Sequence, residues 1–187
     1  MARIVHLTRF SSLESMTDMS TPSALSSVAA TDWQPCGVHH VAVYGTLRAG
    51  GVNDIARLRP GIALVGRVTL TGSLYDLGHY PGLQLQGSQQ VLAEVYPMDP
   101  NLEQALDGIE GLWPHDVGEY TKRILTLPVA LLGGETQMMA VLVYEALPAT
   151  VQHTPRIEAS DWLAWYAGKG VQHPDTAFTL NTLQNKK

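Results

Sequence analysis

From Val38 onward this 187-residue chain shows mainly the alternating apolar pattern of strands, and the pattern switches once, clearly, to a helical period. The switch follows Asp99, a good helix N-cap, and ends at Gly111, a residue that favours the left-handed backbone found at helix ends. The apolar positions between them, spaced at i, i+4 and i+7, are Leu102, Leu106 and Ile109. The sequence therefore predicts one clear amphipathic helix over residues 100–110 in a chain made mainly of strands.

The alternating segments predict five or six strands. We expect strands over residues 38–44, 67–77 (one strand, or two broken at Gly72), 91–98, 120–132 and 136–147, with a hairpin at Gly133-Gly134. Short helices are expected over residues 52–58 and 161–167, the second capped by Ser160, and a surface turn over 78–82. The order of elements does not suit a doubly wound sheet. The predicted class is α+β, either a mixed sheet or a small barrel of about five to six strands, with short peripheral helices.

The two ends of the chain differ from this central part. Residues 11–34 are rich in Ser, Thr and Met and show no sustained period, so we expect residues 1–36 to form a flexible leader. Residues 37–172 would then form the single domain, and residues 173–187 a loosely ordered tail. Met16 and Met19 are alternative starts to Met1.

Charge and cysteine content narrow the range of partners. The chain has 12 Lys and Arg against 17 Asp and Glu, a net charge of −5, which disfavours nucleic acid and anionic membranes as partners. No apolar run approaches the roughly 18 residues that span a bilayer. Cys36 is the only cysteine, so we expect a reducing, cytoplasmic setting and an inert thiol.

Residues 41–51, with the sequence VAVYGTLRAGG, lead from an alternating strand into a glycine-bounded loop. Successive backbone amides after a strand end can converge on an anion, so we expect a small anionic ligand at this loop. The alternative is that the glycines only mark the end of a strand, because one glycine-rich turn is a weak signal.

Glu110 is the carboxylate with the most suggestive position, since it lies one turn beyond Leu106 at the edge of the apolar stripe. Partial burial would disfavour its charged form and raise its pKa toward the range used in proton transfer. The alternative is a glutamate at the rim of an amphipathic helix. By the same geometry we expect Asp107 to be a solvated charge, while Glu94 and Glu119 either face a cleft or flank strands. Phenol groups at strand ends, which can be core residues or reach a ligand, belong to Tyr44, Tyr96, Tyr120 and Tyr144.

Motifs for several other chemistries are missing from the sequence. It contains no HExxH, no paired CxxC, no GxGxxG before a helix, no GxxxxGK[ST] and no GxSxG. His39 and His40 must face opposite sides of a strand, which is poor geometry for binding one metal. We therefore expect no metal and no cofactor. An enzyme built on this chain would need one proton-transferring group and a well-shaped pocket.

Four motifs follow one another along the chain: YGTLR at residues 44–48, AEVY at 93–96, LDGIEG at 106–111, and EY at 119–120. Together they resemble the γ-glutamylcyclotransferase-like family, which includes the γ-glutamylamine cyclotransferases and the AIG2-like domains. The resemblance covers about residues 38–144, and residues 160–163 also look like bacterial members. It implies a small β-barrel with flanking helices and a cleft at its mouth.

The resemblance also implies an activity. A γ-glutamyl amine or small γ-glutamyl peptide would be converted to 5-oxoproline and a free amine by attack of the substrate's own α-amine, with Glu110 as general acid/base. The residues that the resemblance assigns to substrate binding are Tyr44, Gly45, Thr46 and Leu47, followed by Tyr120 and then Tyr144. In two places the chain departs from the family, because Lys122 stands where arginine is common and the loop over residues 111–118 is longer than in short bacterial members. These departures leave the leaving amine open, and the sequence leaves the oligomeric state open.

Two other functions remain open at this point. The first is a binding module that has the same cleft without turnover, and the second is an enzyme acting on another amide. The enzyme interpretation requires that Glu110 face the same cavity as the loop over residues 44–47.

Overall fold

The computed structural model describes residues 32–170, which contain six strands and four helices. In chain order these are β1 (His40–Val43), α1 (Ile55–Leu58), β2 (Gly66–Asp76), β3 (Pro81–Pro97), α2 (Pro100–Ile109), β4 (Tyr120–Leu131), β5 (Thr136–Ala146), α3 (Pro148–Val151), β6 (Arg156–Ile157) and α4 (Trp162–Gly168). The predicted tail over 173–187 and the predicted leader up to residue 31 lie outside the described residues. None of the helices within residues 32–170 is long and apolar enough to cross a membrane.

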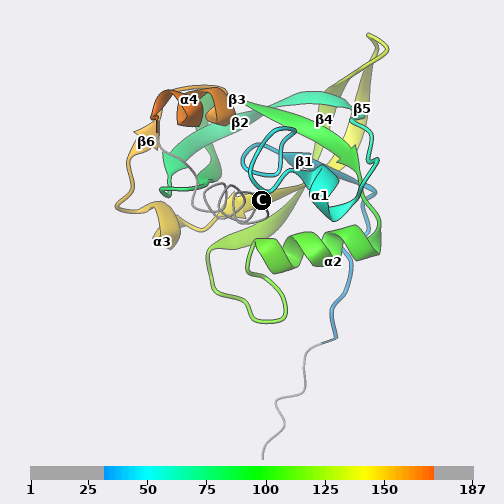
Figure 1. The fold of residues 1–187 in the computed structure, drawn as a ribbon, viewed down its shortest axis with the longest axis horizontal. Helices are drawn as coiled ribbons and strands as arrows, with labels where there is room; N and C mark the ends of the chain where they lie inside the picture. The colour runs from blue at the N-terminus through cyan, green and yellow to red at the C-terminus, as the bar shows by residue number, and fades with distance from the viewer. Residues whose placement is uncertain (1–31, 171–187) are drawn as a thin grey trace, which may run out of the picture. The chain divides into compact units, whose positions relative to one another are not determined.

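Five of the strands close into a mixed barrel (Figure 1). Their order is β3-β1-β5-β4-β2, and pairing of β2 with β3 closes the ring, while β6 is an additional strand beside β2. The pair β1–β5 is parallel and the other pairs described are antiparallel. The predicted α+β class, with a small mixed barrel and short flanking helices, is confirmed.

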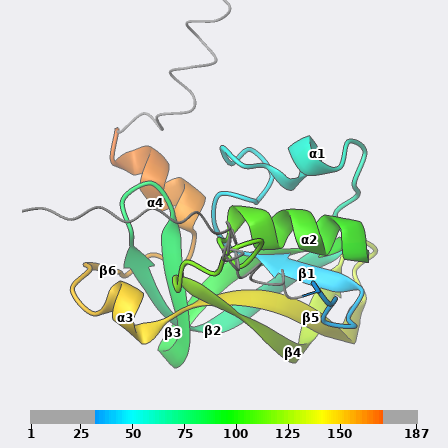
Figure 2. The same ribbon diagram turned by 90° about the horizontal axis from the view of Figure 1, so that it is seen from below.

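The strand β1 is buried on both faces because it separates two apolar cores. Ala42 and, just after the strand, Tyr44 face the barrel interior. Val41 and Val43 face the other way and pack in a second core with Leu106 of α2. This alternation follows from the period of a strand. Figure 2 shows α2 lying along β1, so the helix is held against the strand that leads into the YGTLR loop.

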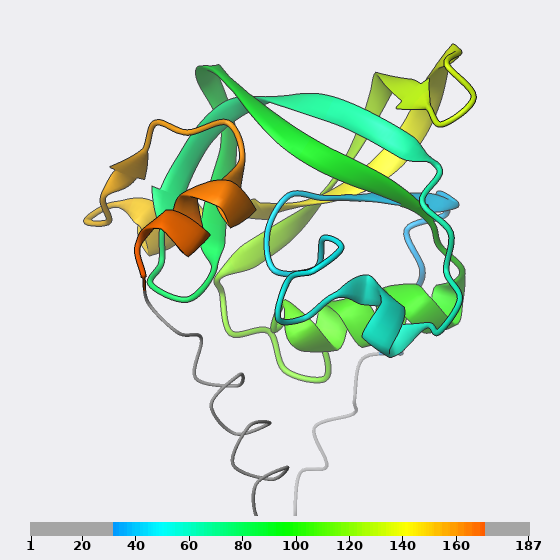
Figure 3. The ribbon, with the colours of Figure 1, turned by 45° about the horizontal axis from the view of Figure 1, so that its top comes forward.

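Helix α2 begins and ends as the sequence predicts. The Asp99 carboxylate accepts a hydrogen bond from the Leu102 amide at 2.9 Å, and Pro100 occupies the first turn. Glu110 is the C-cap, and Gly111 follows with a φ of 69°, a left-handed conformation that favours glycine. Figure 3 shows the loop after β1 lying beside α2. The helix thus ends close to that loop.

The strand β3 is longer than expected, because it begins at Pro81 and not at residue 91. The predicted surface turn over residues 78–82 is therefore wrong for Pro81 and Gly82, which are buried strand residues. Proline is tolerated as the first residue of a strand, and the barrel leaves little room for a side chain at the next position. A Cβ at Gly82 would lie 3.1 Å from side-chain carbons of Leu77, Ala146 and Val151. The short elements α3 and β6 were not expected, since elements of so few residues show no period.

Three further positions differ from the sequence-based expectation. Asp107, expected to be solvated, is 2% exposed, because β4 and β5 supply polar partners for it. Ile109, expected in the buried stripe, is 40% exposed and lines a cavity. Helix α4 is capped by Asp161, whose carboxylate accepts from the Ala164 amide, and not by Ser160.

Candidate active site

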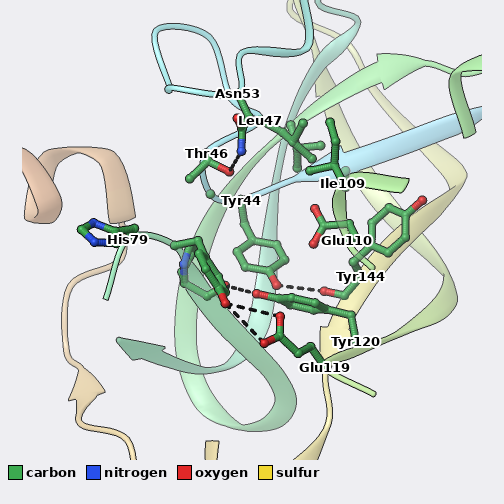
Figure 4. Close-up of a pocket in the computed structure, with 15 residues that line it drawn as sticks. Tyr44, Thr46, Leu47, Asn53, His79, Ile109, Glu110, Glu119, Tyr120 and Tyr144 are labelled. Carbon is green, nitrogen blue, oxygen red and sulfur yellow. Dashed lines mark hydrogen bonds between the residues drawn. The ribbon is translucent and has the colours of Figure 1, made fainter. Parts of the chain in front are cut away.

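A cavity of about 360 Å³ lies between the loop after β1, the end of α2 and the first residues of β3 and β4 (Figure 4). Small-molecule sites have volumes of roughly 300–1,000 Å³. The cavity is lined by all the residues to which the family resemblance assigns catalysis or binding: Tyr44, Gly45, Thr46, Leu47, Glu110, Tyr120 and Tyr144. The other lining residues are Ala42, Val43, Asn53, His79, Tyr80, Pro81, Ile109 and Glu119.

The loop after β1 folds into a compact turn that leaves several amides unused. The Arg48 amide donates to the Gly45 carbonyl, and the Asn53 amide donates to the Thr46 carbonyl, each at 3.1 Å. Among residues 32–170, the amide N–H groups of Gly45, Thr46 and Leu47 have no hydrogen-bond acceptor. Three successive amides in the wall of a cavity are therefore available to an anionic or carbonyl oxygen of a ligand.

Gly45 allows the close approach of this loop to the start of β3. A Cβ built at this position would lie 2.6 Å from Cγ and 2.8 Å from Cδ of Pro81. Real Cβ atoms do not come so near to a rigid ring, so a larger residue would displace either the loop or the strand. The glycine is required by packing at the cavity wall.

Arg48 ties the same loop to the barrel through a buried network. Its Nη1 lies 2.7 Å from Oδ1 of Asp161, and its Nε lies 3.4 Å from Oε1 of Glu94. The second oxygen of Glu94 accepts from the Ala49 amide at 2.9 Å and from the Tyr96 hydroxyl at 2.8 Å. Glu94 is therefore a buried structural charge and does not line the cavity. Because removing one partner of a buried pair is strongly unfavourable, this network holds the loop in a defined position.

Glu110 presents its carboxylate to the cavity from the C-terminal end of α2. Figure 4 shows the carboxylate directed toward the loop that carries Thr46 and Leu47. Burial raises the pKa of Glu110 to about 8, and the negative charges of Glu119 and Asp107 add to this effect. A carboxyl group with such a pKa can both accept and donate a proton near neutral pH.

Three tyrosines line the cavity with their rings while their hydroxyl groups are bound within the protein. Tyr44 donates to the Tyr144 carbonyl at 2.9 Å, Tyr120 donates to the Pro81 carbonyl at 2.8 Å, and Tyr144 donates to Asp107 at 2.8 Å. Burial raises the pKa of all three phenols, so they are neutral. Tyr120 and Tyr144 thus offer a ligand mainly an aromatic surface.

The other side of the cavity contains two polar side chains that the sequence did not reveal, His79 and Tyr80, beside Glu119. The Tyr80 hydroxyl donates to the Glu119 carboxylate, 3.3 Å from Oε2, and His79 Nδ1 lies 3.2 Å from the Tyr166 hydroxyl. His79 and Tyr80 belong to the predicted surface turn, and no local pattern marks them as lining residues. Among the described residues of the lining there is no Lys or Arg to balance the carboxyl groups of Glu110 and Glu119.

The two departures from the family pattern lie outside the cavity lining. Lys122 points instead toward Glu103 and Asp107, with its Nζ 2.6 Å from a carboxylate oxygen of each. The loop over residues 111–118 joins the two lining carboxylates without itself lining the cavity. In the part of the chain that the structure describes, no group of three or more His, Cys, Asp or Glu side chains is arranged to hold a metal ion.

Comparison with known protein families gives a match over most of the described region. The family model described as "Gamma-glutamyl cyclotransferase, AIG2-like" matches residues 41–164. A relative from Vibrio cholerae, named "Putative gamma-glutamylcyclotransferase", is 40% identical over 72 residues, which is 38% of this chain. The match spans 62% of that relative's length.

Solved structures with a similar arrangement of strands have low sequence identity. YkqA from Bacillus subtilis aligns with a TM-score of 0.50 at 22% identity, over 72% of this chain and 44% of that one. An AIG2-like protein from Mus musculus aligns with a TM-score of 0.48 at 24% identity, over 66% of this chain and 88% of that one. The YkqA alignment shows a shared fold and carries no information about substrate.

Proposed function

The chain belongs to the AIG2-like family of γ-glutamyl cyclotransferases, and from this premise we propose that it converts a γ-glutamyl amine or a small γ-glutamyl peptide into 5-oxoproline and a free amine. The observation that carries the proposal is that Glu110 lines the same cavity as the unused amides of Gly45, Thr46 and Leu47. A cytoplasmic location is part of the proposal, because the single cysteine requires no oxidising compartment.

The reaction changes bonds within the substrate alone and needs one side chain to carry a proton. The α-amine of the glutamyl group attacks the γ-carbonyl carbon, a new C–N bond closes a five-membered ring, and the original amide C–N bond breaks. Glu110 takes a proton from the attacking amine and gives it to the leaving nitrogen, so the carboxylate is regenerated. Amides of the loop donate to the glutamyl carboxylate or to the carbonyl oxygen as it becomes negative.

This chemistry explains why so few ionisable residues are needed. The nucleophile belongs to the substrate, and intramolecular attack in a well-held conformation is equivalent to an effective concentration of about 10⁵ to 10⁸ M. The protein must therefore hold the glutamyl chain folded, with its amine near its γ-carbonyl. The braced loop on one side and the rings of Tyr44, Tyr120 and Tyr144 on the other are suited to that task.

The charge of the cavity supports one kind of leaving group over another. Glu110 and Glu119 both carry carboxyl groups, and no Lys or Arg balances them among the described lining residues. The leaving part of a γ-glutamyl peptide has a free carboxylate, which the Glu119 carboxylate repels, as does Glu110 in its ionised form. We therefore favour a leaving amine without a carboxylate, bound on the side of the cavity where Glu119 lies.

The alternative of a binding module without turnover predicts the same cavity but assigns no task to Glu110. A carboxyl group with a pKa of about 8 in the cavity wall favours the enzyme. Above that pKa the ionised group would repel an anionic glutamyl ligand, which is unfavourable for a module that only binds.

The direct test is to incubate the purified protein with a panel of γ-glutamyl compounds and to quantify 5-oxoproline by mass spectrometry, with binding measured in parallel by calorimetry. We expect release of 5-oxoproline from at least one γ-glutamyl amine. Binding of the panel without release would favour the module, and a different product would favour an enzyme acting on another amide. Neither binding nor product with any compound would contradict the assignment of this cavity.

A further inference from the structure

A buried cluster of charges lies on α2, in the two turns that precede Glu110. Glu103 and Asp107 are 1% and 2% exposed, and the Lys122 ammonium of β4 lies 2.6 Å from a carboxylate oxygen of each. Their i, i+4 spacing places both carboxylates on one face of the helix. None of the three lines the cavity, so the substrate-binding role assigned to the cavity does not account for them.

Both oxygens of the Asp107 carboxylate have partners from other elements. Oδ1 accepts from the Tyr144 hydroxyl at 2.8 Å, and Oδ2 accepts from the Trp33 indole N–H at 2.6 Å as well as pairing with Lys122. The Trp33 ring lies 5.4 Å from the Lys122 ammonium, a cation–π distance. Because Tyr144 lines the cavity together with Glu110, Asp107 connects the lysine to the cavity wall.

We propose that Lys122 is a positioning residue for Glu110: it clamps α2 at Glu103 and Asp107, and it screens the charge of Asp107 so that Glu110 keeps a proton affinity suited to catalysis. The inference rests on the proposed role of Glu110 as the proton carrier. It assigns a task to the lysine, to the buried carboxylates and to Trp33, which precedes the barrel.

Asp107 and Lys122 act in opposite directions on the pKa of Glu110. The negative charge of Asp107 raises the pKa of Glu110, in addition to burial and to Glu119. Burial lowers the pKa of Lys122, but hydrogen bonds and charge from Asp107 and Glu103 outweigh it and hold that pKa above its ordinary value. Lys122 is therefore an ammonium at neutral pH, and its positive charge cancels part of the field that Asp107 exerts on Glu110.

Titratable groups surround Glu110 on every neighbouring element. They are Asp107 on α2, Glu119 and Tyr120 at the start of β4, Tyr144 on β5, Tyr44 after β1, and His79 and Tyr80 before β3. Of these, Asp107 is the group in direct contact with Lys122. Removing the charge of Lys122 should therefore alter the pKa of Glu110 mainly because the charge of Asp107 is no longer screened.

The test is to titrate the Glu110 side-chain carboxyl carbon by NMR in protein labelled with ¹³C-glutamate, with the signal assigned by its loss in Glu110→Gln. We expect Lys122→Met to raise the pKa of Glu110 by about one pH unit and Asp107→Asn to lower it by a similar amount. Lys122→Arg should stay close to wild type, because it keeps the charge. When Asp107 is already Asn, adding Lys122→Met should shift the Glu110 pKa less than the same substitution does in the wild-type protein. Arg123→Met is the matched control, since it removes a positive charge from the neighbouring position of β4, where Arg123 pairs with Glu145.

Each outcome decides the proposal independently of turnover. An unchanged Glu110 pKa in both Lys122→Met and Asp107→Asn would overturn it, as would a Lys122→Arg variant that behaves like Lys122→Met. If Lys122→Met does not fold, as judged by its amide spectrum, Asp107→Asn and Lys122→Arg still decide. Absence of 5-oxoproline from the wild-type protein would count against the proposed function and would leave the NMR result intact.

Discussion

The carboxyl groups of Glu110 and Glu119 line one cavity from the two ends of the loop that joins α2 to β4. The charge of Glu119 disfavours ionisation of Glu110 and adds to burial in raising the pKa of Glu110 to about 8. In our account Glu110 is the proton carrier, and Glu119 supplies a negative charge next to the leaving amine. The same pair thus governs how the rate depends on pH and how the protein selects its substrate.

The rate of 5-oxoproline release should rise with pH through about 8. Glu110 accepts a proton only when it is ionised, so kcat/KM increases as the pH passes the Glu110 pKa of about 8. The measurement is kcat/KM across the neutral and mildly alkaline range with two different γ-glutamyl substrates. Glu119→Gln removes a charge that raises this pKa, so the rise should move to lower pH. A kcat/KM that does not change with pH, or a rise whose midpoint is the same in Glu119→Gln, would contradict the assignment of Glu110 as the proton carrier.

Replacing Glu110 by Gln should stabilise the fold at alkaline pH. The pKa of Glu110 is raised from 4.5 to about 8, so its ionisation favours the unfolded chain. This penalty is absent below about pH 4.5, grows as the pH rises, and is complete above about pH 8. We expect Glu110→Gln to unfold in urea with a free energy roughly 2 to 4 kcal/mol above wild type at about pH 9, and with little difference at about pH 4.5. Glu158→Gln, which changes an exposed carboxylate, should show no such pH-dependent gain. An equal effect of Glu110→Gln at both pH values would count against a raised pKa.

Gly45→Ala should impair the reaction more than Thr46→Ala. The new Cβ at position 45 would clash with Pro81 at 2.6 Å and displace the amides that face the cavity. Thr46→Ala removes a hydroxyl that accepts from Asn53 at 3.3 Å, and it leaves the backbone amide in place. We expect kcat/KM to fall by at least about 10² in Gly45→Ala and by less than about tenfold in Thr46→Ala. A larger loss in Thr46→Ala would mean that the side chain, and not the backbone, binds the glutamyl group.

The charge of the leaving amine should determine substrate preference through Glu119. Three γ-glutamyl amides of similar size, whose alkyl chains end in an ammonium, a methyl or a carboxylate group, separate charge from shape. We expect kcat/KM to fall in that order, with about tenfold between the first and the last, equal to roughly 1.4 kcal/mol. Glu119→Gln should narrow this ratio, while the exposed control Glu158→Gln keeps it. If the kcat/KM ratio between the ammonium and carboxylate substrates is unchanged in Glu119→Gln, Glu119 does not discriminate between leaving groups by their charge.

The features that the sequence predicted correctly depend on residues close together in the chain. The N-cap Asp99 and the left-handed Gly111 just beyond the helix follow from a few neighbouring residues. The β4–β5 hairpin is likewise set by its glycines, with Gly134 at a φ of 92°. The candidate site could be outlined for the same reason, because the loop motif and the helix end are each local.

The features that the sequence missed depend on partners far away in the chain. From its position on the helix, Asp107 is predicted to be a solvated charge. In the fold it accepts a hydrogen bond from Tyr144, which lies 37 positions further along the chain. His79 and Tyr80 read as turn residues, and only closure of the barrel places them at the cavity. Trp33 lies in a segment without any period, yet its indole bonds to a residue 74 positions away. No local pattern encodes such pairings.

The central claim is that Glu110 transfers the proton during cyclisation, and one comparison tests it directly. Wild-type protein and Glu110→Gln are given the γ-glutamyl amide that the wild type uses best, and 5-oxoproline release and substrate affinity are both measured. We expect kcat to fall by about 10² to 10⁴ in Glu110→Gln, with a native amide spectrum and retained substrate binding. Release of 5-oxoproline by a folded Glu110→Gln protein at the wild-type rate would contradict the claim.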